Sequence, residues 1–147
     1  MAIPVLHIGR ERGAALLETA VVLPIVLLVA VGIFEFGRAF QTWQVLTNAA
    51  REGARVAVLP GASVDTITAR ATSYLRSGQL SAVDSATVAV APVALDLGGG
   101  ITAAASSVTV NYPFEFMVLQ PVAQLVVRGS TAGAPLTMTA TAVMRIE

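Results

Sequence analysis

The chain has 147 residues with 9 Arg and 9 acidic side chains, so its formal net charge is zero. This balance argues against a nucleic-acid partner, because phosphate binding needs a basic face. There is no cysteine, and the one histidine is His7, so the remainder of the chain cannot form a Ser-His-Asp triad, a histidine metal cluster or a thiolate site. We therefore expect no metal, no cofactor and no enzymatic activity.

The N-terminal region changes from charged to apolar at a glycine. Residues 10–12 are Arg-Glu-Arg, Gly13 follows, and the apolar run of residues 14–34 carries one charge, Glu18. As an α-helix rising about 1.5 Å per residue, this run is long enough to cross a hydrocarbon core of about 30 Å. It exceeds the ~7–15 apolar residues of a secretory signal peptide, which predicts a retained anchor. An acid in such a segment is costly, so Glu18 is a functional candidate.

Two further features of the run concern its shape and its orientation. Pro24 interrupts the helical hydrogen bonding, which membrane helices tolerate. We interpret it as a mild kink, and the alternative is a point where a packed helix bends or melts during assembly. Arginines flank both ends of the run, so the short leader and the long C-terminal part decide the orientation, with the N-terminus inside and the C-terminus outside.

Helical periodicity continues beyond the membrane run to about residue 58, where Pro60-Gly61 ends it. Glu35, at the far membrane boundary, is interpreted as a solvated acid that pairs with Arg38. Trp43 is interpreted as an ordinary core or interface aromatic that packs on a domain. It belongs to an apolar stripe at helical spacing, formed by Phe36, Phe40, Trp43, Thr47, Ala50 and Ala54.

A charged cluster lies near the end of this helix. Arg51, Glu52 and Arg55 fall within little more than one turn. They form either a solvated face, on which Glu52 relieves the repulsion between the two arginines, or a contact with another subunit. The residues alone do not separate these two interpretations.

The second half of the chain predicts one helix followed by strands. Ser63 can cap a helix over residues 63–77, and Gly78 suits its end. Alternating residues then predict strands over 87–93, 107–112 and 136–146. Residues 114–128 either extend the second strand or form a short apolar helix from residue 120, too short for a confident second span.

Three short strands need a cover, and the amphipathic half of the long helix can provide it. The expected fold class is α+β. A long N-terminal helix, transmembrane in its first half, packs through its second half on a small antiparallel three-stranded sheet.

The N-terminal half resembles the TadE-like family of the tight-adherence (Flp-type) pilus, within the type IV pilin-like proteins. The resemblance rests on residues 12–15, Glu18, Leu23-Pro24, and residues 32–38 and 47–55, with weaker likeness over 108–114 and 139–147. It implies a pilin-like fold. It also implies a leader of residues 1–13 removed by a prepilin peptidase at the Gly13–Ala14 bond, a transmembrane helix over 14–36 and an extracytoplasmic domain over 37–147.

The resemblance further implies a minor pilin or pseudopilin of the inner membrane, which takes part in pilus assembly and can enter an extracellular pilus. Its partners would be other pilin-like subunits, an inner-membrane platform, a secretion ATPase and membrane lipid. Glu18 would guide docking by pairing with a neighbouring subunit's new N-terminal amine. The alternative function is an unprocessed, single-span anchored binding or adhesion module.

Overall fold

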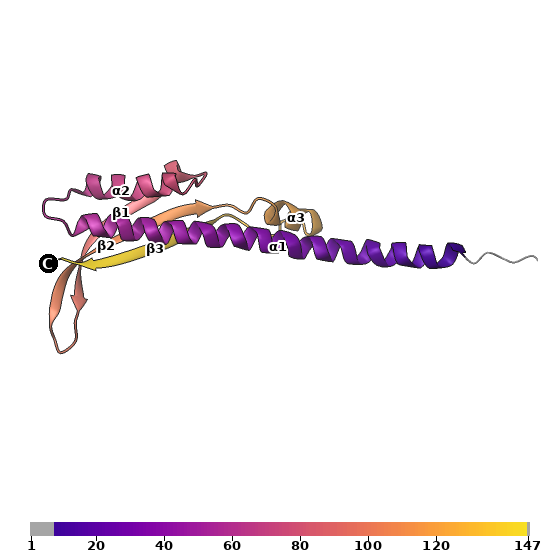
Figure 1. Ribbon diagram of the computed structural model, residues 1–147, viewed down its shortest axis with the longest axis horizontal. Helices are drawn as coiled ribbons and strands as arrows, with labels where there is room; N and C mark the ends of the chain where they lie inside the picture. The colour runs from indigo at the N-terminus through magenta and orange to yellow at the C-terminus, as the bar shows by residue number, and fades with distance from the viewer. Residues whose placement is uncertain (1–7, 147) are drawn as a thin grey trace, which may run out of the picture.

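A computed structural model describes residues 8–146 of the chain. One long helix runs beside a three-stranded sheet and extends far beyond it, as Figure 1 shows. The elements in chain order are α1 (Ile8–Ala57), α2 (Val64–Ser77), the short 3-10 helix η1 (Val83–Ser85), β1 (Thr87–Asp96), β2 (Thr102–Phe114), α3 (Leu119–Val126) and β3 (Leu136–Arg145). This layout confirms the predicted α+β class and its pilin-like arrangement.

The sheet has the strand order β1-β2-β3, and both pairings are antiparallel. Val110 on the central strand pairs with Val88 on one side and with Ala140 on the other. The predicted hairpin is confirmed, but its strands are longer than expected and leave only residues 97–101 as a loop. Three glycines with positive φ, Gly98 to Gly100, turn the chain there, in a backbone conformation that other residues rarely adopt.

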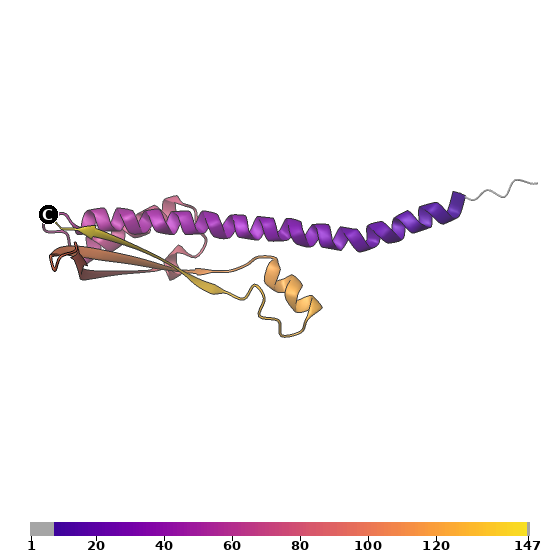
Figure 2. The same ribbon diagram turned by 90° about the horizontal axis from the view of Figure 1, so that it is seen from below.

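The core lies between the sheet and the C-terminal half of α1, which Figure 2 shows running along one face of the sheet. Small residues on α1 allow this close approach. A Cβ added at Gly53 would lie 3.0 Å from a methyl of Val108 on the sheet. At the end of α2, a Cβ added at Gly78 would lie 2.5 Å from a methyl of Val45 on α1. Buried apolar residues on α1, α2 and the sheet complete the core, among them Leu46, Ala49, Ala50, Ile67, Ala71, Leu75, Val108, Val110, Tyr112 and Ala140.

The face that α1 turns to the sheet is not the predicted aromatic stripe. Phe36 and Phe40 are 68% and 64% exposed, whereas Leu46 and Ala49 are fully buried. The stripe was therefore wrong for its aromatic members and right for Ala50 and Ala54, which are buried. The small side chains fit against a close sheet, and the bulky rings do not.

The other helices agree with the patterns that predicted them. The Ser63 side chain accepts a hydrogen bond from the Thr66 amide and caps α2. Gly78 is the C-cap, but its φ of −74° is right-handed, so close packing on Val45 is what requires glycine there. Between Phe114 and Leu119 the chain leaves the sheet, and α3 forms the short helix that was one of the two alternatives.

The core predicts a clear stability contrast on α1. Leu46→Ala removes a fully buried side chain and should lower the free energy of unfolding by about 2–5 kcal/mol. Denaturant titration of the full chain in detergent micelles measures this. Leu59→Ala, at a residue that is mostly exposed, is the matched control and should change stability little. Equal losses for the two variants would contradict this placement of the core.

Candidate functional site

The apolar part of α1 before Glu35 is largely exposed. Residues 14–30 are all exposed, and none of the most apolar window of this helix is buried by the rest of the chain. Among the described residues, this is the one helix long and apolar enough to cross a membrane. In Figure 1 this half projects away from the sheet and from α2. Its length, composition and exposure together indicate membrane anchoring.

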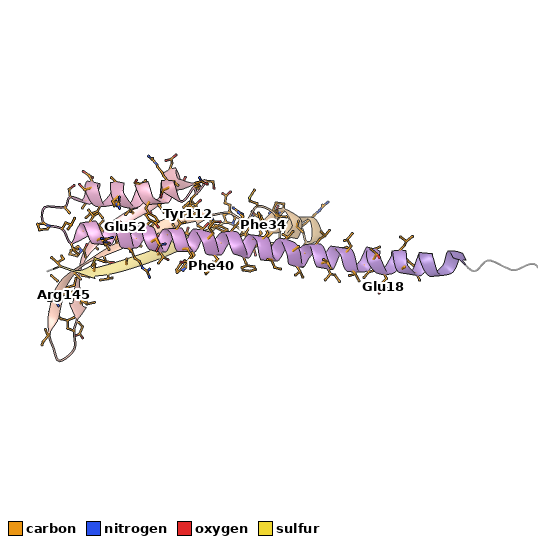
Figure 3. All side chains as sticks on the ribbon, viewed as in Figure 1. Glu18, Phe34, Phe40, Glu52, Tyr112 and Arg145 are labelled. Carbon is orange, nitrogen blue, oxygen red and sulfur yellow. The ribbon has the colours of Figure 1, made fainter. Side chains whose placement is uncertain are left out.

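Glu18 lies on this projecting surface, as Figure 3 shows. It lines a shallow, mostly apolar hollow with Thr19, Val22, Leu23 and Val26. No ion pair to Glu18 is formed by any side chain that the structure describes. Thr19 instead donates its hydroxyl proton to the Ala15 carbonyl at 2.8 Å, so it does not serve the carboxylate.

The predicted processing residues lie in the first turns of α1. Gly13 and Ala14 are both helical. A Cβ added at Gly13 would meet nothing within 4 Å, and no positive φ is recorded there. Neither packing nor backbone conformation within the chain therefore requires glycine at this position.

Pro24 and Trp43 occupy different environments on α1. The helix continues through Pro24, and Figure 2 shows it curving in its N-terminal part. Trp43 is 45% exposed and lies outside the buried core, so the core interpretation of this residue was wrong. Its position beside Phe40 on the exposed stripe leaves the interface interpretation as a prediction.

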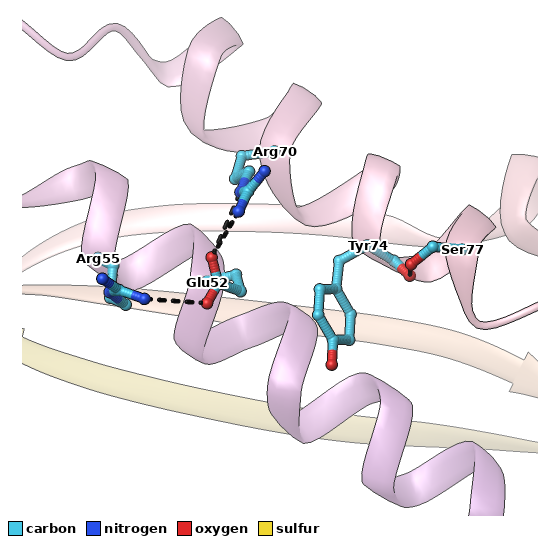
Figure 4. Close-up of polar contacts among 5 residues, drawn as sticks. All are labelled: Glu52, Arg55, Arg70, Tyr74 and Ser77. Atoms are coloured by element: carbon cyan, nitrogen blue, oxygen red, sulfur yellow. Dashed lines mark hydrogen bonds and ion pairs between the residues drawn. The ribbon is translucent and has the colours of Figure 1, made fainter.

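Glu52 on α1 pairs with Arg70 on α2 and with Arg55 one turn further along α1, as Figure 4 shows. Its Oε2 accepts from Nη2 of Arg70 at 2.9 Å and from Nε of Arg70 at 3.3 Å, and its Oε1 accepts from Nη1 of Arg55 at 3.3 Å. The hydrogen bonds from Arg70 lower the pKa of the Glu52 carboxyl, and the positive charges of Arg55 and Arg70 act in the same direction against partial desolvation. We call this cluster the Glu52 clasp.

The clasp includes two of the three residues of the predicted charged cluster, Glu52 and Arg55. Glu52 and Arg55 pair as the solvated-face interpretation expected, while Arg70 from α2 was not foreseen. A pairing between residues 18 positions apart leaves no local sequence pattern by which to find it. Arg51 is exposed and makes no ion pair among the described residues.

A second polar contact, missed at the sequence level, lies at the membrane boundary of α1. Glu35 is fully buried. Its Oε2 accepts from Nη1 of Arg38 at 2.9 Å, and its Oε1 accepts from the backbone amide of Val118. The Arg38 guanidinium carbon lies 5.4 Å from the centroid of the Phe114 ring. The predicted pairing with Arg38 is confirmed, but the expectation of a solvated acid was wrong.

Glu35 is buried because the segment after β2 folds back over it. The carboxylate is tolerated there since a charge-assisted hydrogen bond reaches each of its oxygens. Phe114 and Phe116 stack edge to face at 5.1 Å between centroids and lead the chain from the sheet to this point. We call the contact of Glu35 with Arg38 and Val118 the Glu35 junction.

These arrangements hold helices and strands together. Among residues 8–146, no group of three or more His, Asp or Glu side chains is placed to hold a metal ion. His7 lies outside the described residues.

Residues 13–55 match the family of TadE-like proteins. This confirms the resemblance that the sequence indicated. No curated protein and no solved structure matches the chain. The TadE-like segment begins at Gly13, follows α1 almost to its end and includes Glu18, Glu35, Glu52 and Arg55, but not Arg70 of the clasp. The match over this segment suggests an association with a Tad pilus.

The Glu35 junction predicts a local stability effect. Glu35→Ala removes the buried carboxylate that accepts from the Val118 amide and should cost about 1–3 kcal/mol in local opening. Hydrogen exchange at the Val118 amide should then be roughly tenfold faster or more, measured on the full chain. Glu35→Gln keeps a carbonyl oxygen for this amide and should retain most of the protection. Unchanged exchange in Glu35→Ala would remove the assigned role.

The Glu52 clasp predicts a dependence on pH. A carboxyl whose pKa is lowered on folding contributes stability above its ordinary value of 4.5, and this contribution is lost as the pH falls through the folded pKa. Wild type should therefore exceed Glu52→Gln in denaturant midpoint at pH 7 and approach it at about pH 3. Glu115→Gln changes an exposed acid without an ion pair among the described residues and is the control. A gap that persists undiminished in acid would be evidence against the clasp.

Proposed function

We propose that this chain is a minor pilin or pseudopilin of a tight-adherence, type IV-like pilus. It is made as a precursor and is cut after Gly13. The observation that carries the proposal is the TadE-like match, which begins at Gly13 and covers a fully exposed, membrane-length helix with a single acid near its start. In this proposal residues 1–13 are the leader, 14–36 span the inner membrane and 37–147 lie outside it.

The cut is a hydrolysis of the Gly13–Ala14 amide. Water supplies the second oxygen of the new Gly13 carboxylate, and both of its protons go to the Ala14 nitrogen, which becomes an ammonium group. Two properties of Gly13 support this site. Glycine weakens a helix by about 1 kcal/mol relative to alanine, which favours local opening for a peptidase. A Cβ there would meet open space, so the folded chain itself does not need the glycine.

Docking through Glu18 follows from the cost of a charge in lipid. A carboxylate exposed to hydrocarbon is unfavourable, and an ammonium group at the same depth offsets much of that cost. Cleavage creates such a group at Ala14 on every processed subunit. The absence of a described intrachain ion pair to Glu18 supports a partner on a neighbouring subunit. Ion pairs of this kind set register between packed elements more than they add stability.

The charged end of α1 has a second proposed role, which is contact with another subunit. It depends on Arg51 and on the exposed part of the Glu52 clasp. Arg51 and Arg55 remain largely exposed after the clasp has formed. They form a positive face toward which an acidic surface of a sister subunit can orient. The inner-membrane platform, the ATPase and the prepilin peptidase are the remaining proposed partners.

Co-expression with the matching prepilin peptidase tests the processing step. The intact mass of the purified chain should show that residues 1–13 are removed. Gly13→Leu should block the cut without unfolding the chain, because the added side chain meets open space. Gly37→Leu, at another α1 glycine with open space around it, is the matched control and should be cut normally. An uncut wild-type chain would favour the alternative of an unprocessed anchored binding module.

Glu18→Ala separates cleavage from docking. We expect normal removal of residues 1–13 and at least about a tenfold loss of incorporation into assemblies, equivalent to roughly 1.4 kcal/mol of docking free energy. Quantitative detection of the variant in sheared pilus fractions measures this. Thr19→Ala, one residue away on the same surface, is the control. Wild-type incorporation of Glu18→Ala would remove the docking role and leave the processing step standing.

A further inference from the structure

The short helix α3 lies beside the membrane-length half of α1, although it belongs to the domain that follows. Figures 1 and 2 both show α3 alongside α1, beyond the end of the sheet. Figures 1 and 3 share one view, and in it α3 falls between Phe34 and Glu18 along the axis of α1. This places α3 at the level of the last turns of the apolar run.

The Glu35 junction fixes this position. Val118, directly before α3, donates its amide to the buried carboxylate of Glu35, one residue past the apolar run. The loop after α3 packs back on the start of α3, since a Cβ at Gly133 would come within 2.7 Å of the Gln120 amide nitrogen. These two contacts therefore fix the position of α3 and its following loop along the axis of α1.

The chemistry of the segment suits an apolar boundary. Residues 116–127 contain no charged side chain, and charges resume on either side at Glu115 and Arg128. Met117 and Val127 are 64% and 59% exposed, although each lies next to the ends of α3. A helix of eight residues is about 12 Å long, too short to cross a bilayer and suited to its interfacial layer.

We propose that α3, with Met117 and Val127, is an interfacial element that contacts the phospholipids of the outer leaflet. The proposal rests on the membrane anchoring of α1 and goes beyond the processing and docking roles. The exposed apolar side chains contact the upper part of the acyl chains. Arg128 extends toward the lipid phosphates, as long basic side chains do at membrane interfaces. Because Glu35 fixes the position of α3 along the axis of α1, the contact of α3 with the lipid surface limits how deeply α1 inserts into the membrane.

Lipid is the occupant that the placement favours. Met117 and Val127 flank α3 with exposed apolar side chains, and α3 lies beside the exposed apolar half of α1, so a membrane that surrounds that half also meets this segment. The matched contrast is the tip of the β1–β2 hairpin. Leu97 is 50% exposed there, at the end of the molecule opposite to the projecting half of α1.

Depth measurements on the full chain test the proposal, because a chain without native cysteine accepts single reporter cysteines cleanly. The variants are Met117→Cys, Val127→Cys, Leu97→Cys as the water control and Ile25→Cys as the deep-lipid control. Each carries an environment-sensitive fluorophore, in dilute proteoliposomes of phosphatidylethanolamine and phosphatidylglycerol. Nitroxide lipids labelled near the headgroup or deep in the chain, and aqueous iodide, serve as quenchers.

The expected result is a shallow lipid position for α3. Probes at 117 and 127 should be quenched several-fold more by the shallow nitroxide than by the deep one, with the order reversed at 25. Iodide should quench them several-fold less than the probe at 97. Removing the tether with Glu35→Ala should broaden the depth at 117, and an unchanged depth would overturn the depth-limiting role of the junction.

Three outcomes would overturn the lipid contact. Probes at 117 and 127 that behave like the probe at 97, while 25 is quenched by the deep nitroxide, would place α3 in water and leave the anchoring of α1 intact. Shielding from iodide without lipid quenching would indicate a second copy of the chain as the partner. Failure of the probe at 25 to reach lipid would remove the anchoring itself, and with it this inference.

Discussion

One unbroken helix has to satisfy two environments, and the rest of the structure depends on how it does so. Residues 14–30 of α1 are exposed and apolar apart from Glu18, while the second half of the helix buries one face against the sheet. The change occurs at Glu35. A buried carboxylate is stable there only because Arg38 and the Val118 amide both donate to it. That requirement draws the segment after β2 onto α1 and positions α3.

Beyond Glu35, small residues decide which face meets the sheet. Ala49, Ala50, Gly53 and Ala54 let the backbone of α1 approach β2 closely, so the apolar contact is made by the sheet's larger side chains. The consequence is that Phe36, Phe40 and Trp43 remain outside. The Glu52 clasp then joins the same helix to α2 from the polar side, without an apolar surface of its own.

The sequence predicted the elements well and their contacts less well. Periodicity, Ser63 and the positions of Pro60 and Gly61 identify the helices, and alternation identifies all three strands, because these patterns are local. The side of α1 that packs on the sheet was predicted wrongly for its aromatic residues. The helix has two apolar stripes, and the size of the side chains that fit against the sheet decides which of them is buried. Glu35 with Val118, and Glu52 with Arg70, join positions far apart in the chain, and no local pattern encodes such pairs.

The glycines of α1 divide into two groups by the same physical test. Gly53 is required by contacts within the chain, because a side chain there would press on Val108. Gly13, Gly32 and Gly37 face open space, yet each weakens the helix by about 1 kcal/mol relative to alanine. Since contacts within the folded chain do not explain these destabilising glycines, we look for their reason in contacts with other proteins. In the proposed function, peptidase access is the reason for Gly13, and close approach of a neighbouring helix in the membrane is a reason of the same kind for Gly32. The exposed first half of the segment that matches the TadE-like family thus contains glycines that its own fold does not explain, whereas the second half forms the core.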